Sequence, residues 1–144
     1  MLVSLSLSGT VAVHADTVAP TRAEQITAIA NQYNPIFDSQ YARLIAIAAK
    51  AKTHAPTYAQ YKAILLDFND VRRIINDGLT SSVSDLDAVK AYAEEESGEF
   101  AISIPGLEKM AKSITTITCT KGKLTKKVTS IKPLCPKGYT KKKK

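Results

Sequence analysis

Along most of this chain the apolar residues recur at steps of three and four, which is the spacing of one face of an α-helix. The first such stretch opens at residues 21–24, where Thr21 and Glu24 can each satisfy a backbone N–H of the other at a helix start. Its apolar positions are Ile26, Ile29, Tyr33, Ile36, Phe37, Tyr41, Leu44, Ile47, Ala48 and Ala51. Pro35 lacks a backbone donor, but the pattern resumes after it with almost the same phase. We therefore expect one kinked helix here rather than two helices.

Two further stretches of the same kind follow. The second starts after the turn at residues 52–56 and ends at Gly78, because a glycine beyond the last apolar position marks a helix C-terminus. Its apolar positions are Tyr58, Tyr61, Ile64, Leu65, Phe68, Val71, Ile74 and Ile75. The third starts near residues 84–87, and its apolar positions are Leu86, Val89, Ala93, Phe100, Ile104, Leu107, Met110 and Ile114. Pro105 and the glycine after it are a candidate break that would leave a shorter final piece.

Three long helices joined by a few residues each predict an antiparallel up-down-up bundle. Their apolar seams repeat roughly every 3.5 residues, which is typical of coiled-coil packing. The fold class expected for residues 16–114 is therefore mainly α, a three-helix bundle with coiled-coil character. Glu94, Glu95, Glu96 and Glu99 fall within the third helix, and we expect a solvated acidic patch there, because adjacent exposed glutamates lack the different environments that a catalytic pair needs.

From Thr115 onward the period changes from that of a helix to that of strands. Residues 115–120 are almost entirely Thr, Ile and Cys, residues 121–123 suit a turn, and residues 124–131 alternate enough to pair back. Pro133 ends the second strand, and Cys135 then returns near Cys119. We predict a basic β-hairpin module over residues 115–139, stapled by a disulfide, and a disordered lysine tail over residues 140–144.

The N-terminus has the pattern of a signal peptide. An apolar run from Leu2 to Val13 ends in small residues at the positions that precede a cleavage site before Asp16. The basic segment that usually comes first is missing, so we expect the translation start to lie upstream of Met1. The run is too short to span a bilayer as a helix, and the alternative is a short apolar strand or helix packed into the fold. We expect residues 1–15 to be a signal peptide and the mature protein to be exported.

Export makes the two cysteines informative. Two cysteines in an oxidising compartment can form one disulfide. Cys119 and Cys135 enclose fifteen residues, and closing such a loop is worth about 3 kcal/mol in the chain-entropy model. A metal site is a poor alternative, because His14 and His54 are the only histidines and two thiolates alone do not complete a zinc shell.

The net charge of +7 hides two unequal parts. From Lys112 onward there are eleven lysines and no carboxylate, so the rest of the chain holds nine basic and thirteen acidic residues, a net of −4. The sequence therefore predicts a mildly acidic body and a strongly basic end.

The basic end carries a resemblance to a known group. The residues concerned are Ile117-Thr118-Cys119, Lys121-Gly122-Lys123, Lys126-Lys127-Val128-Thr129, Cys135-Pro136, Gly138-Tyr139 and the final lysine run, with Ile75 to Leu79 and Asp85 to Glu96 in the body. This tail resembles one found in small exported proteins of actinobacteria that have a signal peptide and an Ala-rich helical region. The resemblance implies export and the same architecture. It brings no functional residues to this chain.

The functional classes that remain are mostly non-enzymatic. After signal cleavage His54 would be the one histidine, so no Ser/His/Asp set exists, and the chain shows no glycine-rich phosphate loop and no metal-ligand cluster. We expect no catalysis and no cofactor. The leading hypothesis is an exported or envelope-associated protein whose bundle acts as a spacer or interaction surface and whose basic module contacts an anionic cell-wall polymer or a membrane surface. The competing view is that the lysines merely keep a small β-module soluble.

Clustered lysines attract polyanions as point charges, with strong salt dependence and little selectivity. The residues expected to contact the anionic surface are Lys121, Lys123, Lys126, Lys127, Lys132, Lys137, Lys141, Lys142, Lys143 and Lys144. Nucleic-acid binding is a weaker alternative, because Tyr139 is the one aromatic residue of the tail and the tail contains no arginine. A further alternative is a coiled-coil protein that self-associates or binds a partner through its helices.

Overall fold

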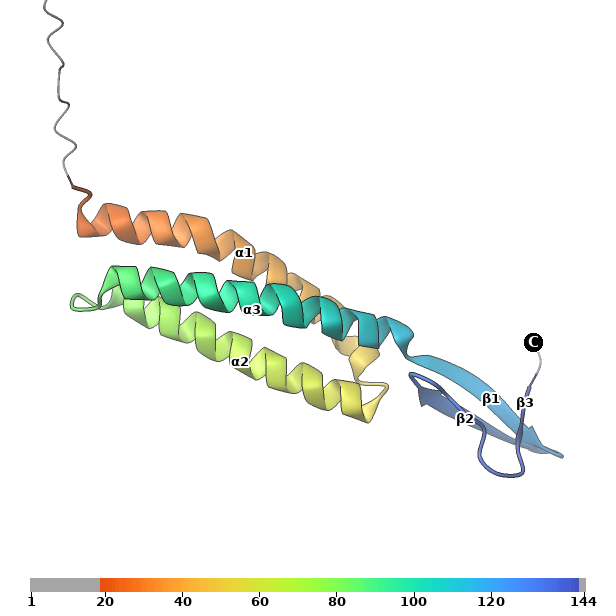
Figure 1. Ribbon diagram of the computed structural model, residues 1–144. Helices are drawn as coiled ribbons and strands as arrows, with labels where there is room; N and C mark the ends of the chain where they lie inside the picture. Colours follow the sequence, from red (N-terminus) through yellow and green to blue (C-terminus); the bar gives the residue numbers. More distant parts are fainter. Residues whose placement is uncertain (1–18, 143–144) are drawn as a thin grey trace, which may run out of the picture.

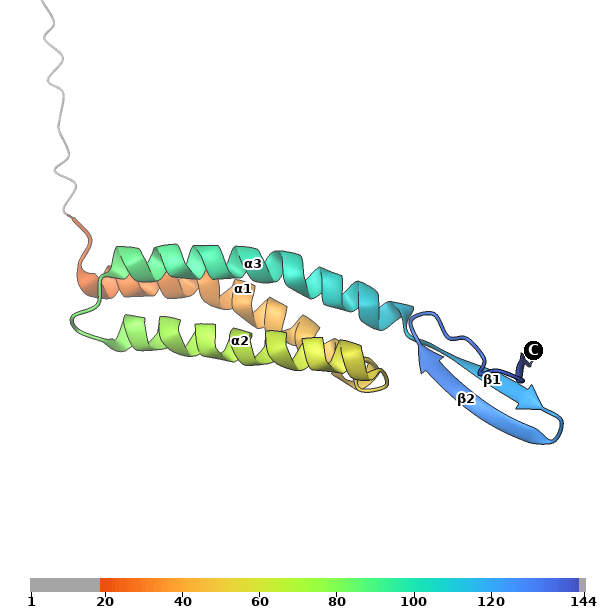
Figure 2. The same cartoon turned by 60° about the horizontal axis from the view of Figure 1, so that its bottom comes forward.

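The computed structural model describes residues 19–142, so the predicted signal peptide over residues 1–15 lies outside the described part of the chain. Three long helices lie side by side and a small sheet projects beyond the end of the third (Figures 1 and 2). The elements are α1 (Arg22–Ala51), α2 (Ala55–Thr80), α3 (Leu86–Ser113), β1 (Thr115–Lys121), β2 (Leu124–Ser130) and β3 (Thr140–Lys141). The predicted fold class, a helical bundle followed by a disulfide-stapled hairpin, is confirmed.

Side-chain caps explain where α1 and α3 begin, whereas the start of α2 has no side-chain cap hydrogen bond and has Pro56 in its first turn. The backbone N–H of Thr21 donates to Glu24 Oε2 at 2.7 Å, and Glu24 N donates to Thr21 Oγ1 at 3.3 Å, which completes the predicted capping box of α1. Asp85 Oδ1 accepts from the backbone of Asp87 at 3.0 Å at the start of α3. These contacts satisfy N–H groups that have no partner inside the helix.

Pro35 and Pro105 each lie inside a continuous helix, α1 and α3 respectively. The prediction of one helix across Pro35 is confirmed, whereas the candidate break at Pro105 was wrong. In α3, the carbonyl that would have accepted a backbone N–H at position 105 belongs to Ala101, which is exposed, so water can satisfy it. On the opposite side of the helix, Ile104 and Leu107 are fully buried at 0% exposure. Their packing offsets the cost of about 3 kcal/mol that proline brings to a helix interior.

The core of the bundle is built around one phenylalanine from each helix. The ring centroid of Phe68 lies 4.9 Å from that of Phe100 and 5.8 Å from that of Phe37. Phe37 and Phe68 are each 1% exposed and Phe100 is 3% exposed. Burying side chains of this size contributes about 1.5–3 kcal/mol each.

Two polar contacts tie α1 to α3. Gln40 Nε2 donates to the Ser97 carbonyl at 2.8 Å in the interior. Nearer the sheet, Arg43 donates two hydrogen bonds to the Glu108 carboxylate, from Nε at 2.8 Å and from Nη2 at 2.9 Å. This two-pronged geometry is the strongest form of a side-chain ion pair. Between residues 19 and 142, none of the helices has an apolar stretch of the length and low charge needed to cross a bilayer.

Candidate functional site

The basic module forms a regular hairpin because glycine allows a tight turn. β1 and β2 pair antiparallel from Thr115 opposite Ser130 to Lys121 opposite Leu124, so only two residues make the turn. The first of these, Gly122, has φ +58, and non-glycine residues in the described range have no positive φ. A positive φ at the first turn residue alone matches a type II′ turn, whose twist suits a hairpin. The turn predicted over residues 121–123 is therefore in place, although Lys121 still belongs to β1.

Side chains of a strand alternate between the two faces of a sheet, and the register therefore sorts the residues of the module. One face, which we call the disulfide face, holds Thr115, Ile117, Cys119, Lys121, Leu124, Lys126, Val128, Ser130 and Lys141. The other, which we call the threonine face, holds Thr116, Thr118, Thr120, Thr125, Lys127, Thr129 and Thr140. The two faces differ in what covers them.

The disulfide face is covered by the segment that follows β2. Cys119 is 0% exposed and is joined to Cys135, with Cα atoms 5.6 Å apart, as the sequence predicted. The segment turns at residues 136–139, where Gly138 has φ +84 and the Tyr139 N–H donates to the Pro136 carbonyl at 2.9 Å. A positive φ at the third residue of such a turn requires glycine or asparagine. A disulfide of this kind indicates an oxidising environment.

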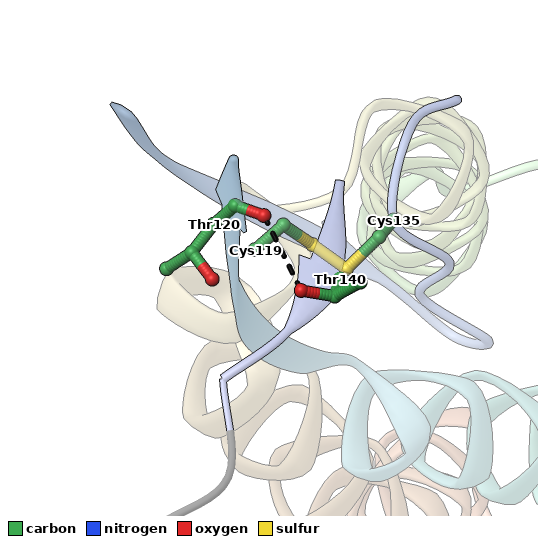
Figure 3. The surroundings of a disulfide bond; sticks show 4 residues. All are labelled: Cys119, Thr120, Cys135 and Thr140. Atoms are coloured by element: carbon green, nitrogen blue, oxygen red, sulfur yellow. Dashed lines mark hydrogen bonds between the residues drawn. A yellow bond between two sulfur atoms is a disulfide. The ribbon is translucent and has the colours of Figure 1, made fainter. Parts of the chain in front are cut away.

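The end of the chain contains a strand that the sequence did not predict. Thr140 and Lys141, assigned to a disordered tail, pair antiparallel with β1 opposite Thr120 and Cys119. The strand order is therefore β2-β1-β3, with β1 in the centre. Thr140 Oγ1 also donates to the Thr120 carbonyl at 3.4 Å, beside the disulfide (Figure 3).

β3 forms because of the disulfide. The disulfide carries the chain across β1, and a short segment is then enough to reach the free edge of that strand. Composition favours disorder in a lysine run, but the disulfide holds Cys135 beside β1, so a loop of only a few residues has to close for Thr140 to pair. Lys143 and Lys144 lie outside the described residues.

The eight predicted contact lysines that the structure describes are all exposed: Lys121, Lys123, Lys126, Lys127, Lys132, Lys137, Lys141 and Lys142. The register groups them. Lys126 and Lys141 stand on either side of Cys119 in one row across the three strands, and Lys121 follows two residues further along β1. Because neighbouring strands lie about 4.8 Å apart, the first two lysines begin roughly 10 Å from each other.

Carboxylates do not neutralise these lysines. The last acidic residue of the sequence is Glu108, in α3. The four ion pairs found within residues 19–142 all join side chains of the helices: Arg43–Glu108, Arg72–Asp38, Arg73–Asp70 and Arg73–Asp77. The charge of the module is therefore available to an external partner.

The acidic residues of α3 lie elsewhere, on the bundle. Burial raises the pKa of Glu96, and the neighbouring carboxylates of Glu99 and of Asp67 on α2 raise it further. Glu94, Glu95 and Glu99 are exposed. The predicted acidic patch is present, and across α2 and α3 its members repel one another.

Over the described part of the chain, His, Cys, Asp and Glu side chains form no group of three or more that could hold a metal ion.

Sequence reasoning identified the lysines but not the threonine face. The threonines at positions 116, 118 and 120 are visible in the sequence as alternate residues. What brings them together with Thr125, Thr129 and Thr140 is the register of three strands, and the third strand was not foreseen.

Comparison with known proteins adds no assignment, because no family model, curated protein or solved structure matches the chain.

Proposed function

We propose that this is a non-enzymatic protein, exported or held at the cell envelope, whose basic module adheres to anionic surface polymers. The helical bundle serves as a spacer or as an interaction surface. One observation carries the proposal: eight exposed lysines lie in a disulfide-stapled module, residues 115–142, that contains no Asp or Glu. The disulfide supports export, because such bonds persist in oxidising compartments.

The lysine geometry also indicates the kind of binding. Ammonium groups are compact point charges without the paired donors that arginine offers to a phosphate or carboxylate. Basic residues close to an anionic surface contribute about 1 kcal/mol each, and salt screens that attraction. We therefore infer adhesion of low specificity that weakens steeply as salt rises.

The test is a binding assay with the mature protein across a salt series. The probes are purified wall polysaccharide, vesicles containing phosphatidylglycerol, and double-stranded DNA. The variant Lys121→Gln, Lys123→Gln, Lys126→Gln, Lys127→Gln removes four charges from the module. At about 1 kcal/mol per lysine, affinity for the bound polyanion should fall at least about tenfold and up to roughly 1000-fold.

A matched control removes the same charge from the bundle. Lys50→Gln, Lys52→Gln, Lys62→Gln, Lys90→Gln changes four exposed lysines that take part in none of the ion pairs found within residues 19–142. This variant should bind almost as the parent does. Equal losses in the two variants would show that net charge alone governs adhesion and would contradict the proposal.

Self-association through the helices is a second candidate. Large apolar side chains stand on the outer surface of the bundle: Ile36 41%, Tyr41 43%, Ile45 48%, Leu66 65% and Ile74 45% exposed. Exposed apolar residues favour contact with another helix when they gather on one side. Analytical ultracentrifugation of the parent and of Ile45→Glu tests this. A parent that stays monomeric at high concentration excludes it.

A further inference from the structure

The threonine face has an ordered arrangement of its own. In one row across the sheet, Thr140, Thr120 and Thr125 lie side by side on β3, β1 and β2. In the next row, Thr118 has Lys127 on one side, and on the other side Lys142, whose backbone N–H donates to the Thr118 carbonyl at 2.9 Å. Within a row, residues on neighbouring strands are about 4.8 Å apart, and successive rows on the same face are roughly 6.7 Å apart along the strand.

The last row, nearest the bundle, is Thr116 beside Thr129. Their Oγ1 atoms are 2.8 Å apart and hydrogen-bond to each other. By contrast, the hydrogen bonds of the described residues leave the hydroxyls of Thr118, Thr120 and Thr125 without a protein partner. These three side chains are half-buried or exposed, so their hydroxyls meet solvent.

The threonine face also differs from the disulfide face in being uncovered. The disulfide and the segment from residue 131 to residue 139 cross the disulfide face and bury Cys119. On the threonine face no residue is buried, and its lysines Lys127 and Lys142 are exposed. An open sheet surface of this kind suits an extended chain better than a compact small molecule, which needs a concave pocket.

We propose that the threonine face binds one strand of an anionic polysaccharide, with Thr118, Thr120 and Thr125 hydrogen-bonding sugar hydroxyls and Lys127 and Lys142 pairing with the acidic groups. The inference rests on the proposed function and names the class of polymer. Two features of this face support the assignment to a polysaccharide. Its unpaired hydroxyls can both donate and accept hydrogen bonds, and two ammonium groups flank them.

Other polyanions fit this surface less well. Nucleic-acid strands are held by aromatic stacking as well as charge, and the threonine face contains no aromatic residue. Anchoring in a bilayer needs an apolar surface, whereas six of its seven side chains in register carry a hydroxyl. A sugar polymer offers both hydroxyl partners and C–H groups that the threonine methyls can contact.

Three soluble probes separate charge from hydroxyl recognition. Alginate carries carboxylates and hydroxyls, polyphosphate carries charge without hydroxyls, and dextran carries hydroxyls without charge. The full mature protein should bind alginate more tightly than polyphosphate of equal charge, and dextran weakest. Anionic vesicles or polyphosphate binding more tightly than alginate would overturn the assignment to a polysaccharide.

Adjacent lysines on opposite faces give a matched pair of variants. Lys127 lies on the threonine face and Lys126 on the disulfide face, and both are exposed on β2. Lys127→Gln should lower affinity for alginate about fivefold more than Lys126→Gln does, because the first removes an ion pair on the binding face and the second only weakens the general attraction of the module. Equal effects would show that the faces are not distinguished and would overturn the inference.

Threonine-to-valine changes test the hydroxyls. Valine keeps the shape and the strand preference of threonine, so the sheet is retained. The triple variant Thr118→Val, Thr120→Val, Thr125→Val should lower alginate affinity about tenfold and change polyphosphate affinity less than twofold. Thr115→Val, on the disulfide face of the same strand, is the control and should change neither.

The outcomes distinguish the inference from the function on which it rests. If the triple variant binds alginate as the parent does while the parent still binds polyanions, the threonine face is not the site and general adhesion stands. If the parent binds neither alginate nor polyphosphate at low salt, both proposals are wrong. Backbone amide NMR spectra of each variant, with the disulfide intact, verify that the sheet has formed.

Discussion

The bundle and the module reach stability by different means, and the difference assigns them different roles. In the bundle, apolar side chains from three helices pack together, and ion pairs such as Arg43–Glu108 join the surfaces. In the module, Cys119 is the one residue of the described strands that is fully buried, and a disulfide holds the segments together. A sheet that depends on a cross-link rather than a core can leave both its lysines and a whole face open to a partner.

The largest expected effect is in the core of the bundle. Phe68→Ala removes the ring that contacts Phe37 and Phe100, and Phe68 is 1% exposed. The free energy of unfolding should fall by about 3–5 kcal/mol, because the cavity cannot close between three helices. Urea denaturation followed by circular dichroism at 222 nm measures this. The exposed Leu66→Ala, on the same helix, is the control, since Leu66 is 65% exposed and should lose little.

The disulfide should matter only for the module. Cys119→Ala with Cys135→Ala releases the segment that covers β1, and a loop of this length is worth about 3 kcal/mol. Hydrogen exchange of the β1 and β3 amides should accelerate accordingly, while the urea midpoint of the helices stays where it was. A comparable drop in helix stability would show that bundle and module fold as one unit.

The bundle and the module also differ in how far their structure could be predicted from the sequence. The helices were predictable because their apolar period is long, and the start of α1 because its cap at Thr21 and Glu24 is local. The predicted end of the second helix at Gly78 was wrong, because α2 continues through this glycine to Thr80. The hairpin and the disulfide were predictable from strand-forming residues, one glycine and two cysteines. The continuity of α3 through Pro105 was not, because it depends on the burial of Ile104 and Leu107 by other helices.

The candidate site was predictable only in part. Counting lysines located the charge, but which face each lysine occupies depends on register, and register is a property of paired strands. β3 exists because Cys135 is tied to Cys119 and brings Thr140 beside Thr120. A lysine-rich composition predicts disorder for such a segment, because composition does not show that Cys135 is cross-linked to Cys119.

Two glycines of the bundle differ in the space around them. A Cβ at Gly98 in α3 would meet nothing within 4 Å, and Gly98→Ala should raise the free energy of unfolding by about 0.5–1 kcal/mol through helix propensity. A Cβ at Gly78 in α2 would lie 2.6 Å from Val89 Cγ2 on α3. Valine is stiff about its first side-chain torsion, so Gly78→Ala should destabilise instead. Thermal melts compare the two, and a gain in both would show a looser contact between α2 and α3.

The smallest effect concerns two carboxylates of the bundle, Glu108 and Glu96, whose pKa values depart from the ordinary one in opposite directions. Hydrogen bonds from Arg43 hold the pKa of Glu108 below its ordinary value of 4.5. Its contribution to stability is therefore present above that pH and is lost as pH falls through the lowered pKa. Glu108→Gln should cost about 0.5–1 kcal/mol at pH 7, because the pair is partly exposed, and the cost should shrink as pH falls through the lowered pKa.

Glu96 should respond with the opposite sign. Burial and the nearby carboxylates of Glu99 and Asp67 raise its pKa above 4.5. Folding therefore favours its protonated form, and the stability it contributes is present in acid and is lost as pH rises through the raised pKa. Glu96→Gln should stabilise the bundle at pH 7, with the gain vanishing below about pH 4, where the glutamate itself is neutral. Urea midpoints of both variants between pH 3 and 8 test the pair. If Glu96→Gln destabilises the bundle at pH 7, as Glu108→Gln does, the acidic patch across α2 and α3 is not repulsive.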